Sequence, residues 1–168
     1  MREFIEVLKS RRSVRKYKPV PISKETIEEI IGCARFSPTA RNEQPWIFIA
    51  VNDKKTLARI SKITSPNGEF IKDASWAIAV FCRNTKYYLE DGSSATVYML
   101  LASWAKGIGS CWIAGDKKPY AEEIRKILKV PQDYRLVSLV SLGHPENIPV
   151  KEKKPLEEII FWGEYGKC

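Results

Sequence analysis

Short apolar runs recur along this 168-residue chain, and segments of helical period separate them. Four runs have the length of strands: Trp46–Val51, Ala77–Cys82, Ser110–Ile113 and Leu136–Leu142. The longest uninterrupted run, Trp76–Cys82, is far shorter than the roughly 20 residues that a membrane-spanning helix needs. The chain is therefore predicted to fold around a sheet of four or five short strands, with no membrane-spanning segment.

The intervening segments predict five helices, because their apolar residues recur every three or four positions. They are a first helix that contains Phe4, Ile5 and Leu8 and ends before Arg11, a second capped by Ser23, a third capped by Asp53, a fourth from about Asp91 to Ala105, and a fifth with Pro119 at its first position. We predict a single α+β domain over residues 1–168, since a chain of this length can bury one sizeable core. Residues 145–168 end in an apolar stretch, Ile159–Trp162, which favours an arm that completes a sheet, in this chain or on a partner.

The net charge of +8 is unevenly distributed. Residues 1–20 hold seven basic and two acidic side chains, a net +5, and Lys151–Lys154 add +2. The two clusters could converge on one anionic ligand, form a nucleic-acid surface, or make an ordinary solvated basic face. Four tryptophans, Trp46, Trp76, Trp104 and Trp112, lie within apolar patterns, which disfavours a stacking platform for nucleic acid.

Few side chains here suit catalysis. The cysteines Cys33, Cys82, Cys111 and Cys168 lack metal-ligand spacing, and His144 is the only histidine, so we predict no metal site. The acidic pairs Glu28-Glu29, Glu122-Glu123 and Glu157-Glu158 are typical of solvated helix faces. We therefore predict no catalytic side chain, and expect that a cofactor would carry any chemistry.

Two segments could bind such a cofactor. Arg11-Arg12-Ser13-Val14-Arg15 offers guanidinium forks and a hydroxyl to a dianionic phosphate. Residues 37–46 (SPTARNEQPW) combine two prolines with small, hydroxyl and amide side chains, and so could form a rigid loop against a flat heterocycle. Taken singly, each could also be an ordinary loop.

Together these segments carry a resemblance. The RRSVR motif at 11–15, the SPxxxNxQPW motif at 37–46, GIGSCWI at 107–113 and KKPLEE at 153–158 resemble, in this order, the FMN-dependent nitroreductase family. The resemblance implies an α+β fold with a mixed central sheet, a homodimer, and FMN between the subunits. It also implies that NADH or NADPH reduces the flavin, which then reduces a nitroaromatic, a quinone or a similar flat acceptor by a ping-pong mechanism.

The resemblance further assigns the cofactor-binding residues. Arg11, Arg12, Ser13 and Arg15 would hold the FMN phosphate and ribityl chain, and Lys151 and Lys153 would close on the phosphate. Pro38, Thr39 and Asn42 would come from the other subunit against the isoalloxazine, and Asn67 would hold its pyrimidine edge. Ile113, Ala114 and Gly115 would line the flavin through backbone groups near N5.

Two other functions remain open from the sequence. One is a flavin-binding protein on the same scaffold, with a dedicated substrate or a storage or regulatory role; the other is a basic nucleic-acid-binding module. The N-terminus alternates charged and apolar residues and lacks the apolar core of a signal peptide, so we expect a cytoplasmic location, with no membrane partner.

Overall fold

The computed structural model describes residues 3–166. Its helices are α1 (Phe4–Ser10), α2 (Lys24–Ala34), α3 (Lys54–Ile63), α4 (Tyr88–Ala105) and α5 (Ala121–Ile127), with 3-10 turns η1 (Ala40–Asn42), η2 (Glu69–Asp73) and η3 (Leu156–Glu158). Its strands are β1 (Trp46–Val51), β2 (Trp76–Arg83), β3 (Gly109–Ala114) and β4 (Tyr134–Gly143). Each predicted strand run lies inside one of these strands.

The four strands form one sheet in the order β1-β2-β4-β3, and every neighbouring pair is antiparallel. Within residues 3–166 the parallel pairing is limited to an isolated bridge between Ser13 and Ser110. The predicted α+β class is therefore confirmed, and the mixed character expected of the sheet is confined to that one bridge. β4 lies inside the sheet, whereas β1 and β3 are its edges.

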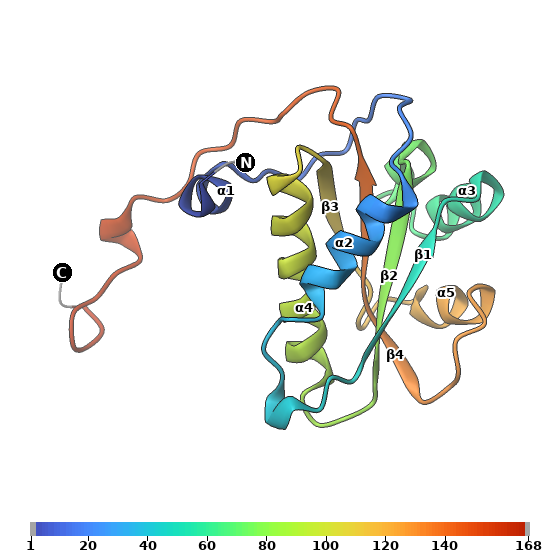
Figure 1. The fold of residues 1–168 in the computed structure, drawn as a ribbon. Coiled ribbons are helices and arrows are strands. Elements are labelled where there is room, and N and C mark those ends of the chain that lie inside the picture. The colour runs from blue at the N-terminus through green and yellow to red at the C-terminus, as the bar shows by residue number, and fades with distance from the viewer. Residues whose placement is uncertain (1–2, 167–168) are drawn as a thin grey trace.

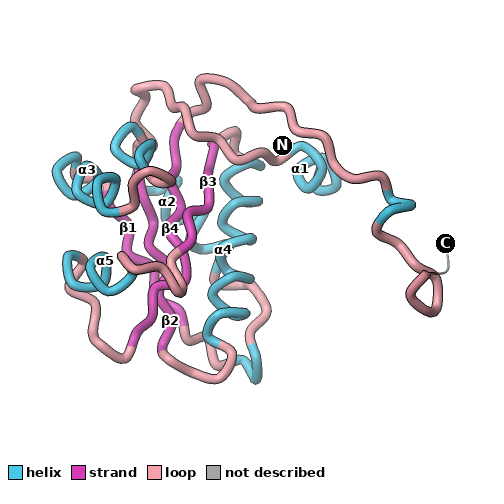
Figure 2. Tube along the Cα trace, turned by 180° about the vertical axis from the view of Figure 1, so that it is seen from behind, coloured by secondary structure: helices cyan, strands magenta, loops and turns pink. Residues whose placement is uncertain are grey.

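Helices cover both faces of the sheet (Figures 1 and 2). α2 and α4 pack on one face, through Ile27, Ile30 and Met99, and α3, η2 and α5 pack on the other, through Leu57, Ile71 and Ile124. A third cluster joins α1 to the end of the sheet, and contains Val7, Val14, Tyr17, Ala74 and Trp104. The first cluster is also contacted by Trp46, Trp76 and Trp112, and the third contains Trp104. All four tryptophans expected in the core therefore lie in or against one of these clusters.

The predicted caps are confirmed for two helices. The Ser23 hydroxyl accepts from the Thr26 N–H at 3.2 Å, and the Asp53 carboxylate accepts from the Thr56 N–H at 2.8 Å. The other two starts differ from the prediction. α4 begins at Tyr88, three residues before Asp91, and α5 begins at Ala121, because the segment before it forms a turn.

The C-terminal segment leaves the body after β4 and passes α1 (Figure 1). Within this chain the run Ile159–Trp162 forms no strand, and only η3 forms nearby, so the arm on a partner subunit stays a prediction. A strand needs a sheet edge that offers free N–H and C=O groups, and this segment lies away from both edges of the sheet (Figures 1 and 2). Its apolar side chains are exposed, Trp162 by 72%. Cys168 lies outside the described residues.

Within residues 3–166, no helix is both long and apolar enough to cross a membrane.

Candidate functional site

The basic segment after α1 runs along the outer edge of β3. Ser13 bridges Ser110, and the Val14 N–H donates to the Ser110 carbonyl at 2.9 Å. The Val14 side chain is fully buried, against Gly109, where an added Cβ would lie 2.9 Å from the Val14 Cβ. This close approach fixes the segment against the first residues of β3.

Three of the predicted phosphate ligands gather at one point beside β3. In an extended segment alternate side chains share a side, so Arg11, Ser13 and Arg15 lie opposite the buried Val14. Burial raises the pKa of the Cys111 thiol, while Arg15, the Ser13 side chain and Arg11, in that order, oppose the shift. All three are therefore close enough to influence one sulfur atom, and they supply positive charge and a hydroxyl beside β3.

Arg12 points elsewhere. Its Nη1 donates to the Lys9 carbonyl at 2.8 Å and to the Arg11 carbonyl at 2.9 Å. These bonds satisfy backbone carbonyls at the C-terminal end of α1, where a positive charge is favourable. The structure thus separates Arg12 from the group formed by Arg11, Ser13 and Arg15.

Tyr17 secures the basic segment from its far side. Its hydroxyl donates to the Val14 carbonyl at 2.7 Å and shares a 2.7 Å hydrogen bond with the Ser141 Oγ. Burial raises the pKa of Tyr17 far above its usual value, so the hydroxyl keeps its proton. Sequence reasoning missed Tyr17, although its spacing of two from Arg15 marks it as part of the same extended segment.

η2 contacts the basic segment through Phe70. The Arg15 guanidinium lies 5.8 Å from the centre of the Phe70 ring, in cation–π range. Asn67 lies in the turn between α3 and η2, three residues before Phe70. Phe70 is therefore a neighbour of the basic segment, and the assignment of Asn67 to the flavin stays a prediction.

Ile113, Ala114 and Gly115 lie at the opposite end of β3. The Ala114 carbonyl accepts from the Tyr120 hydroxyl, and the Gly115 N–H donates to the Val137 carbonyl at 3.1 Å. Because the Ser110 carbonyl points away from β4, the alternation of an edge strand directs the N–H groups of Trp112 and Ala114 the same way. The outer edge of β3 thus offers backbone donors along about 13 Å from the basic group, at roughly 3.3 Å per residue.

The loop that carries Pro38, Thr39 and Asn42 has an unusual backbone. Arg41, Asn42 and Gln44 have φ values of 54°, 57° and 47°, although none is glycine. Such residues cost of order 1 kcal/mol or more each unless their surroundings hold them. The Thr39 Oγ1 accepts from the Gln44 N–H at 3.1 Å, and the Gln44 side chain donates to the Asn42 Oδ1 at 3.0 Å.

This loop and the basic group lie at opposite ends of the sheet (Figure 1). The loop leads into Trp46, opposite Cys82 near the start of β4, whereas the basic segment lies beside Gly109, opposite Gly143 at the end of β4. At roughly 3.3 Å per residue, the part of β4 between these two levels is about 26 Å long. One chain therefore keeps Pro38, Thr39 and Asn42 apart from the arginines.

Lys151 and Lys153 lie on the exposed C-terminal segment. That segment starts beside the basic one, because the Lys18 N–H donates to the His144 carbonyl at 2.8 Å and the Glu146 N–H donates to the Lys16 carbonyl at 3.0 Å. Both lysines follow this anchor by five or more residues, on the stretch that leaves the body.

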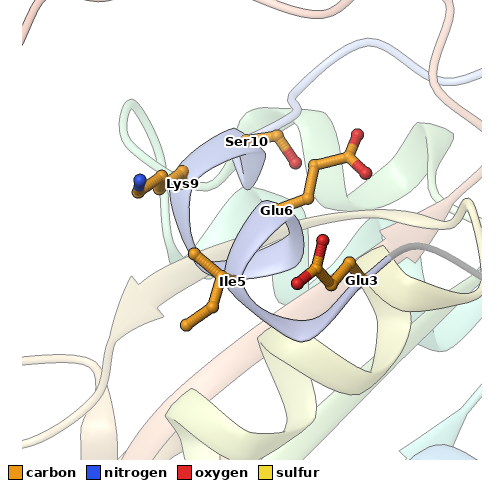
Figure 3. A pocket seen from close by; sticks show the side chains of 5 residues that line it. All are labelled: Glu3, Ile5, Glu6, Lys9 and Ser10. Atoms are coloured by element: carbon orange, nitrogen blue, oxygen red, sulfur yellow. The ribbon is translucent and has the colours of Figure 1, made fainter.

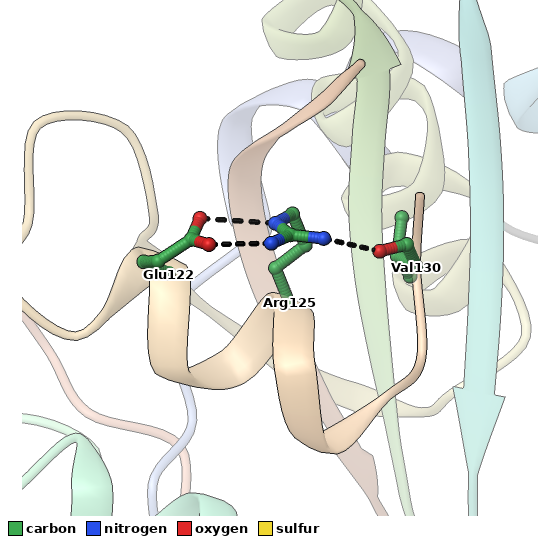
Figure 4. Close-up of polar contacts among 3 residues, drawn as sticks. All are labelled: Glu122, Arg125 and Val130. Atoms are coloured by element: carbon green, nitrogen blue, oxygen red, sulfur yellow. Dashed lines mark hydrogen bonds and ion pairs between the residues drawn. The ribbon is translucent and has the colours of Figure 1, made fainter. Parts of the chain in front are cut away.

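Two other polar groups of the described chain do not suit a phosphate. A hollow of about 460 Å³ beside α1 is lined by Glu3, Ile5, Glu6, Lys9 and Ser10, and its two carboxylates do not suit a phosphate (Figure 3). Glu122 is held by Arg125, which also donates to the Val130 carbonyl at 2.6 Å (Figure 4). The hydrogen bond from Arg125 lowers the pKa of Glu122, as expected of an ion pair on a solvated helix face. No cluster of three or more potential metal ligands occurs in residues 3–166.

Comparison with known proteins identifies the family of this chain. The family model described as "Nitroreductase family" matches residues 8–75 and 67–144. The chain belongs to the nitroreductase family. This family generally uses FMN, and its members are oxidoreductases.

Three proteins with different names are similar to this nitroreductase-family chain over most of its length. An Archaeoglobus fulgidus protein, provisionally named NADH dehydrogenase/NAD(P)H nitroreductase, is 36% identical over 154 residues, which cover 88% of each chain. The structure of an FMN-dependent nitroreductase from Clostridium difficile is 32% identical, with a TM-score of 0.88 over 96% of this chain and 99% of that one. An iodotyrosine deiodinase of Thermotoga neapolitana is 25% identical over 185 residues, covering 95% of this chain and 97% of that one.

Proposed function

We propose that this protein is an FMN-dependent oxidoreductase, which takes hydride from NADH or NADPH and reduces nitroaromatics, quinones or similar flat acceptors. The observation that carries the proposal is the convergence of Arg11, Ser13 and Arg15 beside the start of β3. In a nitroreductase-family chain this is the group expected to bind the FMN phosphate.

The chemistry of this group fits a phosphate monoester. Two guanidinium groups and a hydroxyl supply several donors, and guanidinium forks bind phosphate oxygens through two parallel hydrogen bonds. None of the ion pairs found within residues 3–166 involves Arg11 or Arg15, so their charges are available to a ligand. Lys151 and Lys153 would add charge from the C-terminal segment.

The outer edge of β3 would hold the rest of the cofactor. The N–H of Ala114 points away from β4 and can donate to the ring, while Ile113 and Gly115 fix the strand on its inner side. FMN, when bound, supplies the centre that accepts and delivers hydride. No protein acid, base or nucleophile is assigned, and both substrates would use one exposed face in turn.

A second copy of the chain would complete the site. Because Pro38, Thr39 and Asn42 lie at the far end of the sheet, we infer that they reach the flavin of a partner subunit in a homodimer. An apolar groove of about 470 Å³ between α1 and α4, lined by Phe4, Tyr98 and Leu101 among others, supports such an interface. Residues 145–168 would form an arm on the partner, which would cover Leu156, Ile159 and Trp162.

The decisive experiment is the isolation of the protein after saturation with FMN. A yellow dimer that oxidises NADH or NADPH in the presence of menadione, with parallel lines in double-reciprocal plots, is the expected result. A protein that retains no flavin would refute the proposal, and intersecting lines would refute its ping-pong part.

A second candidate, a dedicated reductive reaction on the same scaffold, is favoured by the match to an iodotyrosine deiodinase over 95% of this chain. Iodide release from iodotyrosine, with poor turnover of menadione by the flavin-loaded protein, would favour this alternative. A storage or regulatory role would show flavin binding with neither activity.

A further inference from the structure

Asp91, in the first turn of α4, is the one charged side chain that is buried within residues 3–166, with 4% of its surface exposed. Burial of a carboxylate is unfavourable unless hydrogen bonds hold it. Its Oδ1 accepts from the Ala40 N–H at 2.9 Å, and its Oδ2 finds no hydrogen-bond partner among the described residues. The carboxylate therefore holds the loop of Thr39 and Asn42 at a cost in solvation.

Unpartnered buried polar atoms collect around the same loop. Besides Asp91 Oδ2, the described residues contain two such side-chain atoms, Ser37 Oγ and Thr85 Oγ1. Ser37 begins the loop, and Thr85 follows Arg83, whose N–H donates to the Pro45 carbonyl at 2.9 Å at the loop's end. One unsatisfied polar atom and three left-handed residues thus lie within residues 37–45, and the other two unsatisfied atoms belong to segments that contact this loop or its ends, a combination that marks functional segments.

Asp91 itself is rigidly placed by the sheet. A Cβ on the adjacent Gly92 would lie 2.7 Å from the Val137 Cγ2 and 2.9 Å from the Cys82 Sγ, so α4 approaches the strands very closely here. Asp91 is also close to Cys82. Burial raises the pKa of the Cys82 thiol to about 12, and the Asp91 charge contributes further to this rise. The loop is therefore tied to a closely packed point of the fold.

We propose that Asp91 is a positioning residue, which holds Thr39 and Asn42 in the shape that completes the flavin site of a second subunit. The inference rests on the proposed function. Asp91 acts through the Ala40 backbone, between the two residues it positions, and touches no reacting atom.

The bond can be removed from either side. Asp91→Ala removes the acceptor, and Ala40→Pro removes the donor while leaving the acid intact. The backbone accepts proline here, because Ala40 opens η1 and Thr39 has φ −134° and ψ 149°, values that a residue before proline adopts. The proline Cδ would take the place of the amide hydrogen that points at the Asp91 Oδ1, so this variant breaks the bond by displacing the carboxylate. Asp91→Asn keeps an oxygen acceptor of the same size. Glu90→Gln, on the exposed neighbour in the same helical turn, controls for the charge of the helix N-terminus.

Each full-length variant is stripped of flavin and titrated with FMN by fluorescence quenching, and its melting temperature is measured without FMN. Asp91→Ala and Ala40→Pro should each raise the FMN Kd about tenfold, the effect of one hydrogen bond to a charged group. The double variant should lose no more than either single one, since both remove the same bond. Asp91→Asn should stay within about threefold of the wild type, and Glu90→Gln should match it.

The outcomes separate the two proposals. A wild-type protein that binds no FMN refutes the proposed function itself. If the wild type binds FMN and the Asp91→Ala and Ala40→Pro variants bind it equally well, whatever their melting temperatures, Asp91 has only a structural role. Should Asp91→Ala fail to fold, the Ala40→Pro variant decides. Unchanged FMN affinity in Ala40→Pro overturns the positioning role. A loss of FMN affinity in Ala40→Pro, together with near wild-type affinity in Asp91→Asn, supports it.

Discussion

Replacing Tyr17 by phenylalanine tests how the basic segment is held. The substitution deletes one oxygen atom and leaves the ring in its place, against Gly143, where an added Cβ would lie 2.5 Å from the Tyr17 Cδ1. It removes the 2.7 Å bond to the Val14 carbonyl and the 2.7 Å bond to the Ser141 Oγ. The Ser141 hydroxyl keeps a longer contact, 3.5 Å to the Cys111 carbonyl.

The expected loss follows from these two bonds. A buried hydrogen bond contributes about 1 kcal/mol net, so the free energy of unfolding should fall by about 2 kcal/mol. For a chain of this length, that corresponds to a drop of roughly 4–8 °C in melting temperature. FMN affinity should fall as well, because Val14 joins Ser13 to Arg15.

Thermal unfolding of the flavin-free protein, followed by circular dichroism at neutral pH, measures the effect. Tyr165→Phe is the matched control, because Tyr165 is 89% exposed and the same oxygen is lost there to solvent. A Tyr17→Phe protein that melts within about 1 °C of the wild type would show that the hydroxyl does not hold the segment.

Arg15→Ala should weaken FMN binding by about 1.5–3 kcal/mol through loss of a charge-assisted phosphate contact, and a fluorescence titration that matches the wild type would exclude Arg15 from the site. Deletion of residues 156–168 should reduce dimer formation and flavin content together; a truncated protein that sediments as a yellow dimer would contradict the arm. Alkaline pH should destabilise the fold, since burial raises the pKa of Tyr17: its stabilisation is complete below the unfolded value of about 10 and is lost as pH rises toward the folded value. Between pH 8 and pH 11 the melting temperature should therefore fall more steeply with pH for the wild type than for Tyr17→Phe. Equal slopes of melting temperature against pH would count against this account.

The sequence predicts the strands better than the helix starts. β1 is found at Trp46–Val51, as predicted, because a continuous apolar run between polar turns leaves little choice of boundary. α4 starts earlier than predicted, at Tyr88, because no side chain caps it and the sequence therefore carries no start signal. The terminal run at Ile159–Trp162 has the composition of a strand, but composition does not supply the sheet edge with which it would pair.

The candidate site, too, was predicted only in part from the sequence. The RRSVR motif predicts a phosphate-binding segment, and in the structure Arg11, Ser13 and Arg15 all influence the Cys111 thiol. The different direction of Arg12 depends on the carbonyls at the end of α1, which motif reasoning does not resolve. Asp91 was missed because an acidic residue in a first helical turn is ordinarily solvated; the adjacent Gly92, which lets α4 approach the sheet, is the signal that could have found it.

The strand order has a consequence for the nascent chain. Of the four strands in residues 3–166, β4 is the last to leave the ribosome, yet it is the neighbour of both β2 and β3. Until residues 134–143 have emerged, β3 lacks a partner strand and the apolar β2 keeps one edge open. The sheet can therefore close only late in synthesis, through contacts between residues far apart in sequence, which favours slow folding. Chains interrupted before Tyr134 would expose a hydrophobic strand edge, and are expected to aggregate or be degraded.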